Sequence, residues 1–512
     1  MKLATKSEIN KLDADTILNY HVPSMLLMEH AAYKLFEYIQ ESHKGKSIFI
    51  LCGPGNNGGD GLALARQLIS FGESKVKVGL IVSRDKLSED GKSYYAICEA
   101  LGIPCLKFPE EKEEIENEII HSEVIVDSIF GTGLSRKVEG ELGELFIKIN
   151  NSRAFKLSVD IPSGIACDTG KVLGVAIKAD CTITFQMGKV GLFLYPGISY
   201  TGELRIVPIG IPKELMLKLP SKHYAIDKEM AKKILPIRPM RSNKGTYGKV
   251  LMIGGQVGMS GAICLATLGT MRVGAGLVTM AVPYSLCNIV EQKVTEAMTL
   301  PLSETDGHLN EEAAKLLKDR LPSFNVISIG PGLGRSLSVQ KVMEEVLAAD
   351  KITVVDADGL YALKPYLECL KERKAPIIIT PHVGEMSYLS GESIGDILEN
   401  PIESAKAFSA KYNVIVVLKL ERMIVAIPRQ DNIYINTKGH QAIAKGGAGD
   451  VLTGFITGLV AQNKQPTQAS LLGVYLHGYT TQKLVEEKGE YSVLPSDLLD
   501  YVSESFKEIS SL

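Results

Sequence analysis

The stretch SIFILCGPGNNGGDGLALARQLI, residues 47–69, decides the fold of the first half of the chain. Its apolar run SIFILC (47–52) leads into a glycine-rich segment, and a helical pattern carrying LALARQLI follows. Strand, glycine loop and helix in this order are the repeating unit of parallel α/β sheets. We therefore expect a parallel sheet that is built outward from this strand.

Elements on both sides of this stretch fit the same plan. Thr5 followed by Glu8 has the spacing of a capping box and predicts a first helix. A second helix is expected after Ser24, with one apolar face formed by Met28, Ala32, Leu35 and Ile39. Further strands are expected, up to about residue 210, in KVKVGLIV, EVIVDSIF, FKLSVDI, CTITF and ELRIVPI.

A second α/β series follows a segment, 211–248, that is interrupted by four prolines. We place the junction near residue 222, which gives domains 1–222 and 223–512. A helix is expected from about Ser260 and another after KGGAGD (445–450). The strands of this series are expected in KVLMIGG, GLVTMAV, NVISIG, ITVVDAD, PIIIT, NVIVVLKL, RMIVAI and NIYIN.

Composition excludes several classes of function. The 512 residues include 56 Lys+Arg and 59 Asp+Glu, a net charge of −3, so there is no overall basic field to hold nucleic acid or an anionic membrane. The charged first residues lack the apolar core of a secretory signal, and no apolar run is long enough to span a membrane, so we expect a soluble cytoplasmic protein. Eight cysteines without a C-x-x-C pair are expected to be buried, reduced thiols: Cys52, Cys98, Cys105, Cys167, Cys181, Cys264, Cys287 and Cys369.

The first glycine loop has the form G-x-G-x-x-G, with Gly53, Gly55 and Gly58. In dinucleotide-binding folds a pyrophosphate lies at the helix start. Asp60 would repel it there, which disfavours an ordinary dehydrogenase. In a purely structural interpretation Asp60 only caps the helix and Asn56 and Asn57 form a tight turn.

Two more predicted strands end in acids and glycines, in VDSIFGTG (126–133) and VDIPSG (159–164). Loops at the carboxyl ends of parallel strands converge on one crevice, so Asn57, Asp127 and Asp160 are expected to meet there. Carboxylates beside amides and hydroxyls suit either acid/base chemistry or a hard cation with oxygen ligands.

NNGGDG (56–61), VDSIFGTGL (126–134) and VDIPSGI (159–165) together resemble the N-terminal half of the bifunctional NAD(P)H-hydrate repair enzymes. The resemblance implies a Rossmann-like domain that epimerises the R and S forms of NADHX and NADPHX, cofactors hydrated at carbon 6 of the nicotinamide ring. It implies K⁺ near Asn57, Asp127 and Ser163. Our hypothesis is that Asp160 acts as acid and then base while Asp127 holds the cation. The implied substrate contacts are Asn56, Asn57, Gly58, Gly59, Asp60, Gly131, Thr132, Gly133, Leu134, Ser135, Arg136, Lys137 and Asp160.

KGGAGD (445–450) places glycines at the start of a predicted helix, where free N–H groups attract an anion. Asp450 beside such an anion hole is suited to deprotonate a hydroxyl that attacks a phosphate, which indicates phosphoryl transfer. In the alternative interpretation Asp450 only complements the helix dipole. The predicted anion hole consists of Gly446, Gly447, Ala448 and Gly449.

The GAGD motif resembles the ribokinase-like superfamily. With KGTYGKVLMIGG (244–255), SGA (260–262), IGPGLGR (329–335), VVDADGL (354–360) and TPHVGEM (380–386) it looks like the nucleotide-dependent NAD(P)H-hydrate dehydratases. The resemblance implies two three-layer α/β domains, ADP or ATP as cosubstrate, Mg²⁺ on its phosphates, and a homo-oligomer. It implies Asp450 as base, hydrate contacts at Ala262, Gly332, His382 and Asp450, and nucleotide contacts at Lys419, Leu420, Glu421, Arg422, Met423 and Gly449.

The sequence departs from the family pattern at a few positions. Val383 replaces a proline, His440 and Gln441 stand where a Gly-Asn pair is usual, and the loop KLERM (419–423) is bulkier than the small Lys-Gly-Ala-Thr type. The last two changes bear on nucleotide preference. The alternative function is a ribokinase-like small-molecule kinase fused to a non-catalytic Rossmann-like binding module.

Overall fold

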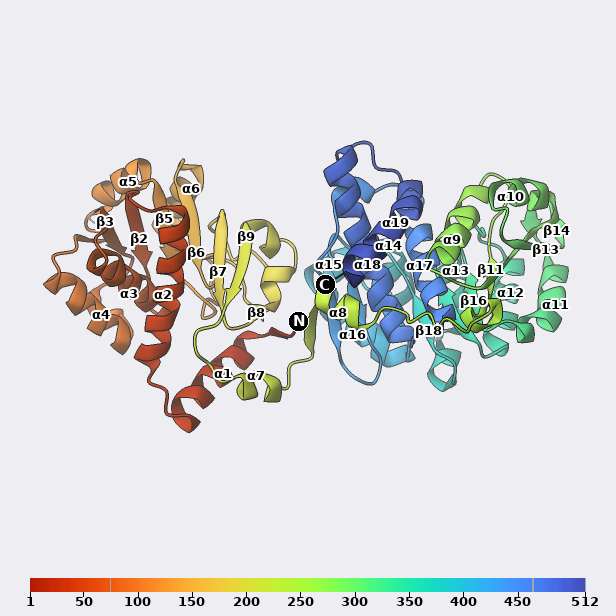
Figure 1. Cartoon of the computed structure of the whole chain (residues 1–512), viewed down its shortest axis with the longest axis horizontal. Coiled ribbons are helices and arrows are strands. Elements are labelled where there is room, and N and C mark those ends of the chain that lie inside the picture. The colour runs from red at the N-terminus through yellow and green to blue at the C-terminus, as the bar shows by residue number, and fades with distance from the viewer. Residues whose placement is uncertain (74, 463–464, 512) are drawn as a thin grey trace. The chain divides into compact units, whose positions relative to one another are not determined.

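The computed structural model describes residues 1–73, 75–462 and 465–511. The chain divides into two units, Lys2–His223 and Tyr224–Leu512, the second of which also takes in Met1. Each unit is an α/β layer structure around a mainly parallel sheet, as the sequence predicts (Figure 1).

The sheet of the N-terminal unit has seven strands in the order β4-β3-β2-β5-β6-β7-β9, and all of them pair in parallel. All five residues of β2 are buried, because helices cover both faces of the sheet. Of the seven strands of this sheet, only the three-residue edge strand β4 was not predicted from the sequence. The strands are β2 (Ile48–Cys52), β3 (Val76–Leu80), β4 (Cys105–Lys107), β5 (Val124–Ser128), β6 (Phe155–Val159), β7 (Cys181–Phe185) and β9 (Glu203–Val207).

Helices form the outer layers of this unit (Figure 1). On one face pack α2 (Ser24–Ser42), α3 (Asn56–Ser70) and α4 (Glu89–Ala100), and on the other α5 (Lys112–His121) and α6 (Gly140–Asn151). The predicted apolar face of α2 is buried. The remaining elements are α1 (Lys6–Asn19), which begins with the predicted capping box of Thr5 and Glu8, the short pair β1 (Leu3–Ala4) and β8 (Gly188–Lys189), and α7 (Lys213–Lys218).

The sheet of the C-terminal unit has ten strands in the order β10-β21-β20-β19-β18-β17-β16-β11-β12-β13. Pairing is parallel from β13 to β19 and antiparallel from β19 through β20 to β21. The strands are β10 (His223–Ile226), β11 (Lys249–Ile253), β12 (Leu277–Pro283), β13 (Met298–Leu302), β16 (Val326–Ile329), β17 (Ile352–Val355), β18 (Ile377–Ile379), β19 (Ile415–Leu418), β20 (Ile424–Ala426) and β21 (Ile433–Asn436), with a separate hairpin of β14 (Glu304–Thr305) and β15 (His308–Leu309).

Two helices of this unit, α9 (Ser260–Arg272) and α17 (Ala448–Ala461), pack against each other at close range. A Cβ atom on Gly454 would lie 2.2 Å from the carbonyl oxygen of Ala266, so only glycine allows this approach. The other helices are α8 (Lys228–Lys233), α10 (Cys287–Lys293), α11 (Glu311–Arg320), α12 (Leu337–Ala348), α13 (Asp358–Leu363), α14 (Val383–Ser390), α15 (Ile394–Glu399), α16 (Pro401–Tyr412), α18 (Pro466–Lys488) and α19 (Pro495–Ser510).

Strand order reverses once in each parallel sheet. In the N-terminal unit the chain runs outward from β2 to β3 and β4, then returns to β5 on the other side of β2. In the C-terminal unit β11 is followed outward by β12 and β13, and β16 lies on its other side. Ligands of open α/β sheets bind at the carboxyl ends of strands at such a switch point.

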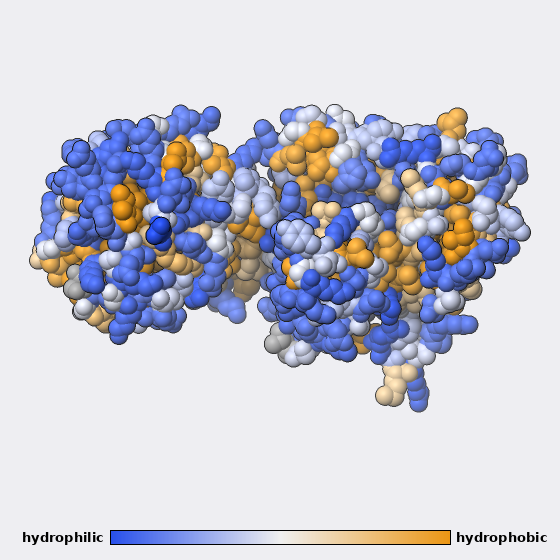
Figure 2. All heavy atoms as spheres, turned by 90° about the horizontal axis from the view of Figure 1, so that it is seen from above, coloured by the Kyte–Doolittle hydropathy of each residue, from blue (hydrophilic) through white to orange (hydrophobic). Residues whose placement is uncertain are grey.

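The eight cysteines are free thiols, as predicted, but not all of them are buried. Cys369 is exposed, and Cys105 and Cys287 are half-buried, so the prediction of burial was wrong for these three. No helix among the described residues is long and apolar enough to cross a membrane. On the face shown in Figure 2, hydrophilic residues predominate and hydrophobic residues lie in small groups between them.

Candidate active sites

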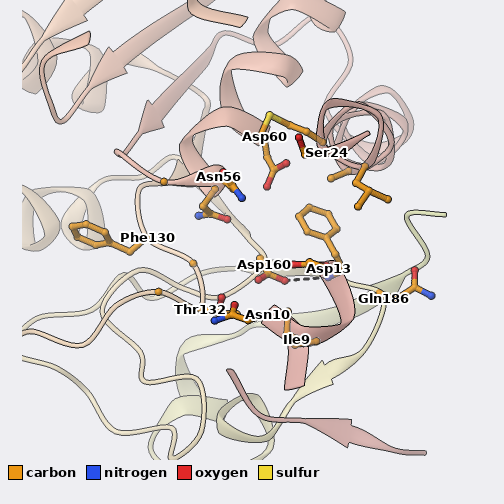
Figure 3. Close-up of a pocket in the computed structure, with 18 of the residues that line it drawn as sticks. Ile9, Asn10, Asp13, Ser24, Asn56, Asp60, Phe130, Thr132, Asp160 and Gln186 are labelled. Carbon is orange, nitrogen blue, oxygen red and sulfur yellow. Dashed lines mark hydrogen bonds between the residues drawn. The ribbon is translucent and has the colours of Figure 1, made fainter. Parts of the chain in front are cut away.

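A cavity of about 540 Å³ lies at the switch point of the N-terminal unit. Most of the predicted epimerase contacts line it: Asn56, Asn57, Asp60, Gly131, Thr132, Gly133, Leu134, Ser135, Arg136 and Asp160 (Figure 3). Gly58, Gly59 and Lys137 do not. A Cβ on Gly58 would lie 2.0 Å from the carbonyl oxygen of Gly53, and one on Gly59 would lie 2.5 Å from Met28 Cε. These two glycines therefore allow α3 to pack closely.

Asp60 lies more than one turn inside α3 and does not cap it. The helix begins at Asn56, its N-cap is Gly55, and no side chain caps it. The interpretation of Asp60 as a capping residue was therefore wrong. Burial raises the pKa of Asp60 well above its usual range, and the nearby carboxylates of Asp160 and Asp13 raise it further, while Lys189 opposes them.

Asp160 follows β6 with a left-handed backbone, φ 66°, a conformation that is rare outside glycine. Its Oδ1 accepts hydrogen bonds from Thr184 Oγ1 at 3.1 Å, from the Phe185 N–H at 3.2 Å and from Lys189 Nζ. The side chain of Lys189 is only 1% exposed, and it also donates to the Phe185 carbonyl oxygen at 2.9 Å. A buried lysine paired with a carboxylate is thus part of this site.

Two residues of this site, Lys189 and Asp13, were not predicted from the sequence. Lys189 follows the predicted strand CTITF, and its burial depends on β8 pairing with the distant β1, which no local pattern reveals. Asp13 comes from α1, whose acidic residues look like an ordinary solvated helix face. The pKa of Asp13 is raised to about 6, chiefly by burial, while Lys189 lowers it and Asp160 raises it.

Asp127 lies behind the cavity lining and is 1% exposed. Its carboxylate accepts hydrogen bonds from Ser158 Oγ at 2.8 Å, Ser163 Oγ at 2.5 Å and the Ser163 N–H at 2.8 Å. These donors are neutral, and within the described ranges no cationic side chain pairs with Asp127. With the side-chain amide oxygen of Asn57, the oxygens of Asp127 and Ser163 are of the kind that a monovalent cation such as K⁺ binds.

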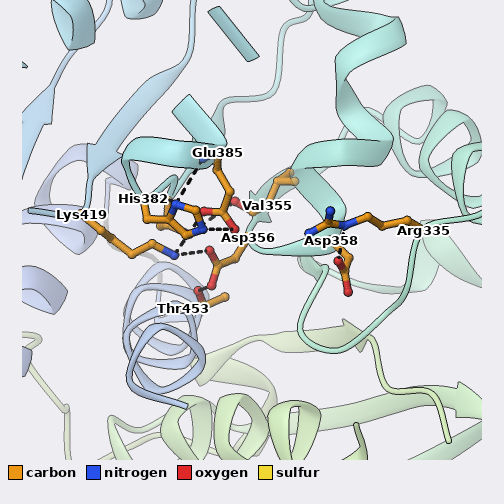
Figure 4. A network of polar contacts seen from close by, with 9 residues as sticks. Arg335, Val355, Asp356, Asp358, His382, Glu385, Lys419 and Thr453 are labelled. Carbon is orange, nitrogen blue, oxygen red and sulfur yellow. Dashed lines mark hydrogen bonds and ion pairs between the residues drawn. The ribbon is translucent and has the colours of Figure 1, made fainter. Parts of the chain in front are cut away.

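The second site lies at the carboxyl ends of β17, β18 and β19 in the C-terminal unit (Figure 4). Asp356, 1% exposed, accepts from Lys419 Nζ at 2.7 Å through Oδ1 and from Thr453 Oγ1 at 2.7 Å through Oδ2. Lys419 Nζ is also 3.7 Å from Glu385 Oε2. A Cβ on Gly449 would lie 3.3 Å from Lys419 Nζ, which brings the GAGD loop against this ion pair.

Asp450 is the third residue of α17 and lies in this acidic surrounding. Burial raises its pKa to about 7, with Asp356 adding to the effect and Lys419 opposing it. Gly447 is the N-cap, with φ 100°. The Ala448 N–H donates to the Lys445 carbonyl oxygen at 3.3 Å, so this amide of the predicted anion hole already has a partner.

The remaining predicted dehydratase residues lie in three places. Ala262 and Gly332 lie together at the switch point, where a Cβ on Gly332 would be 3.2 Å from that of Ala262. His382 caps α14, accepting from the Glu385 N–H at 3.2 Å, while its ring remains 56% exposed. Of the predicted nucleotide loop (419–423), Lys419 points to Asp356, Arg422 donates to the Thr437 carbonyl oxygen, and Glu421 is exposed.

Both units match known protein families. A family model described as YjeF-related protein N-terminus matches residues 24–191, and one described as NAD(P)H-hydrate dehydratase matches residues 250–504. A bifunctional NAD(P)H-hydrate repair enzyme of Moorella thermoacetica is 36% identical over 510 residues, which are 98% of this chain and 96% of that protein. The chain belongs to the bifunctional NAD(P)H-hydrate repair enzymes.

Solved structures resemble the C-terminal unit of this repair enzyme. A ribokinase-like superfamily protein of Enterococcus faecalis is 26% identical, with a TM-score of 0.50, and the match covers 57% of this chain and 98% of that one. A second structure is that of an ADP/ATP-dependent NAD(P)H-hydrate dehydratase of Bacillus subtilis, crystallised with ATP/Mg²⁺. It is 30% identical with a TM-score of 0.49, and the match covers 56% of this chain and 98% of that one. The predicted ribokinase-like fold is confirmed, and the relatives support the repair enzyme rather than a kinase fused to a binding module.

Proposed function

We propose that the N-terminal unit interconverts the R and S forms of NADHX and NADPHX, and that the C-terminal unit dehydrates the S form to NADH or NADPH with ADP or ATP. The observation that carries this proposal is the placement of Asp450, at a glycine-rich helix start beside the Lys419–Asp356 pair, in a chain that also holds the Asp160–Lys189 cavity. One carboxylate site is suited to phosphoryl transfer and the other to proton transfer.

For dehydration, Asp450 takes the proton of the carbon 6 hydroxyl as that oxygen attacks the terminal phosphorus of the nucleotide. The N–H groups of Gly446, Gly447 and Gly449 stabilise the charge that develops on the phosphoryl oxygens. Phosphate is a far better leaving group than hydroxide, so the ring nitrogen can then expel it. Loss of a proton from carbon 5 restores the reduced cofactor. ADP thereby yields AMP and phosphate.

The metal of this site would bind mainly through the nucleotide. Within residues 1–73, 75–462 and 465–511 no three His, Cys, Asp or Glu side chains are gathered to hold a metal ion. Mg²⁺ is typically held by substrate phosphates with one or two carboxylates, and Asp356, Asp358 and Glu385 are near enough to raise the pKa of Asp450. When bound, Mg²⁺ supplies positive charge to the phosphates.

For epimerisation, we assign proton transfer to Asp160, because its Oδ1 accepts the three hydrogen bonds described above while the residue lines the cavity. Asn57, Asp127 and Ser163 would hold K⁺, which supplies the positive charge that buried Asp127 lacks. Replacing K⁺ by tetramethylammonium is expected to slow epimerisation without changing dehydration of S-NADHX.

The deciding experiment is recovery of NADH absorbance from a mixture of R- and S-NADHX, with Mg²⁺ and either ADP or ATP. Complete recovery is expected, and the nucleotide that gives the faster rate is the preferred cosubstrate. Recovery that stops at the S fraction would refute the epimerase assignment, and no recovery with either nucleotide would refute the dehydratase assignment. NADPHX in parallel gives the cofactor preference. Cytoplasmic location and homo-oligomer formation remain predictions.

A further inference from the structure

Asp13 is the one carboxyl group that α1 contributes to the epimerase cavity. Figure 3 shows it beside Asp160, with Asp60 turned toward the same space from α3. Within the described part of the chain, no hydrogen bond fixes the Asp13 carboxyl group. Asp15, two residues along the same helix, accepts a hydrogen bond from Asn19 Nδ2 at 3.1 Å and does not line the cavity.

Asp160 differs from Asp13 in its surroundings. Every hydrogen bond found to the Asp160 carboxylate in the described residues is donated to Oδ1, including that of the Lys189 ammonium group. Oδ2, which accepts no hydrogen bond within the described residues, is therefore left to accept one from a molecule in the cavity. Epimerisation at carbon 6 needs both a proton donor and a proton acceptor, because a hydroxyl must leave one face of the ring and water must add to the other.

We propose that Asp13 is a second catalytic carboxyl of the epimerase, which protonates the departing carbon 6 hydroxyl while Asp160 accepts a proton from the water that adds. This inference rests on the proposed epimerase function. The Asp13 O–H bond breaks and its proton goes to the hydroxyl oxygen. The carbon–oxygen bond breaks, water leaves with the electron pair, and the ring nitrogen lone pair forms a carbon–nitrogen double bond.

In the second half of the reaction, a water oxygen bonds to carbon 6 from the other face and one of its protons goes to Asp160. The electron pair of the double bond returns to the ring nitrogen, so the product differs from the substrate only in configuration. Proton exchange with solvent restores Asp13 and Asp160, and in the reverse direction the two carboxyl groups exchange roles. Paired carboxyl groups in unlike environments divide acid and base work in this way.

The charges around Asp13 support this division. It is faced by Asp60 from α3, by Asp160 from the loop after β6, and by Lys189 from β8. Burial raises the pKa of Asp13 to about 6, which is close to the pH at which a general acid works best. Asp60, only 9% exposed, is more deeply buried than Asp13, and this burial raises its pKa well above the usual range.

The test is Asp13→Asn in the full-length protein, with Asp15→Asn as the matched control on the same helix. Interconversion of R- and S-NADHX is followed above the uncatalysed rate, and dehydration of pure S-NADHX is measured in the same preparation. We expect Asp13→Asn to slow epimerisation about 100-fold or more, Asp15→Asn to leave it unchanged, and both variants to dehydrate S-NADHX normally. An Asp13→Asn variant that epimerises within about twofold of wild type overturns the inference.

A structural role of Asp13 is separated from a catalytic one by Asp13→Ala. Added acetate or formate should restore part of its epimerase activity, since a small carboxylic acid can enter the vacated space. Activity that is lost without rescue, together with a lowered melting temperature, would assign a structural role and overturn the inference. Wild-type protein that fails to epimerise would instead overturn the proposed epimerase function, and this inference with it.

Discussion

Lys419 Nζ lies 2.7 Å from Asp356 Oδ1, and this ion pair lies against Gly449, one residue before Asp450. The pair sets the electrostatic surroundings of Asp450, because Asp356 raises the pKa of Asp450 and Lys419 lowers it. The balance, with burial, leaves the pKa of Asp450 at about 7. A base with such a pKa is well matched to neutral conditions.

Asp450→Asn is expected to reduce dehydration of S-NADHX by about 100-fold to 10,000-fold, the usual range for loss of a general base. The cause is that asparagine cannot take the hydroxyl proton, while the shape of the site is kept. Epimerisation should be unchanged, because the two units hold separate sites. Asp500→Asn, on the exposed face of α19, is the control. Loss of both activities in a well-folded Asp450→Asn variant would contradict separable sites.

The pH dependence of dehydration should report the same carboxyl group. Only ionised Asp450 can act as base, so kcat/KM for S-NADHX should fall with decreasing pH below about 7 and level off above it. The expected slope is about tenfold per pH unit on the acid side. Initial rates at saturating nucleotide, from about pH 5.5 to 8.5, test this expectation. A profile that is level down to pH 5.5 would contradict the assignment of Asp450 as base.

The fold could be predicted from the sequence because strands that are buried on both faces consist of continuous runs of apolar residues. IFILC at 48–52 and III at 377–379 are such runs, and both are central strands. The missed strands lie at sheet edges or are very short. HYAI (223–226) and MTLPL (298–302) are edge strands, which are only half-buried and carry a weaker pattern.

The site could be predicted only where its residues belong to a local motif. Asp160 and Asp450 lie in glycine-rich segments at a strand end and a helix start, so the residues next to them in the sequence identify them as candidate site residues. Lys189 and Asp13 do not lie in such a motif. Lys189 becomes part of the cavity because β8 pairs with β1, in which Leu3 lies 185 residues before its partner Gly188. Asp13 becomes part of it through the packing of α1.

Lys189→Met is expected to lower the free energy of unfolding of the N-terminal unit by about 3 to 5 kcal/mol, the usual cost of breaking a buried ion pair. The cause is that the Asp160 carboxyl group would lose the buried ammonium group with which it is paired. Denaturant unfolding of the full-length protein measures the change. The double variant Lys189→Met with Asp160→Asn should regain part of the loss, because no uncompensated charge remains. A single variant as stable as wild type would show that the pair contributes nothing to stability.

His477 should make the C-terminal unit sensitive to acid. The ring is 2% exposed and lies 3.1 Å from the carbonyl oxygen of Ala448, and burial lowers its pKa from 6.5 to about 4. Between these pKa values the unfolded chain binds a proton that the folded chain does not bind. The contribution of neutral His477 to the free energy of unfolding is therefore fully present above about pH 6.5 and decreases as the pH falls toward 4. At pH 5 the loss is about 2 kcal/mol.

His477→Gln keeps an N–H donor for the Ala448 carbonyl oxygen but cannot be protonated. Its free energy of unfolding relative to wild type should therefore rise by about 2 kcal/mol between pH 7.5 and pH 5. Denaturant unfolding of both proteins at the two pH values measures this difference, and the comparison cancels the titration of all other groups. An equal pH dependence in both proteins would mean that His477 is protonated as readily in the folded chain as in the unfolded one.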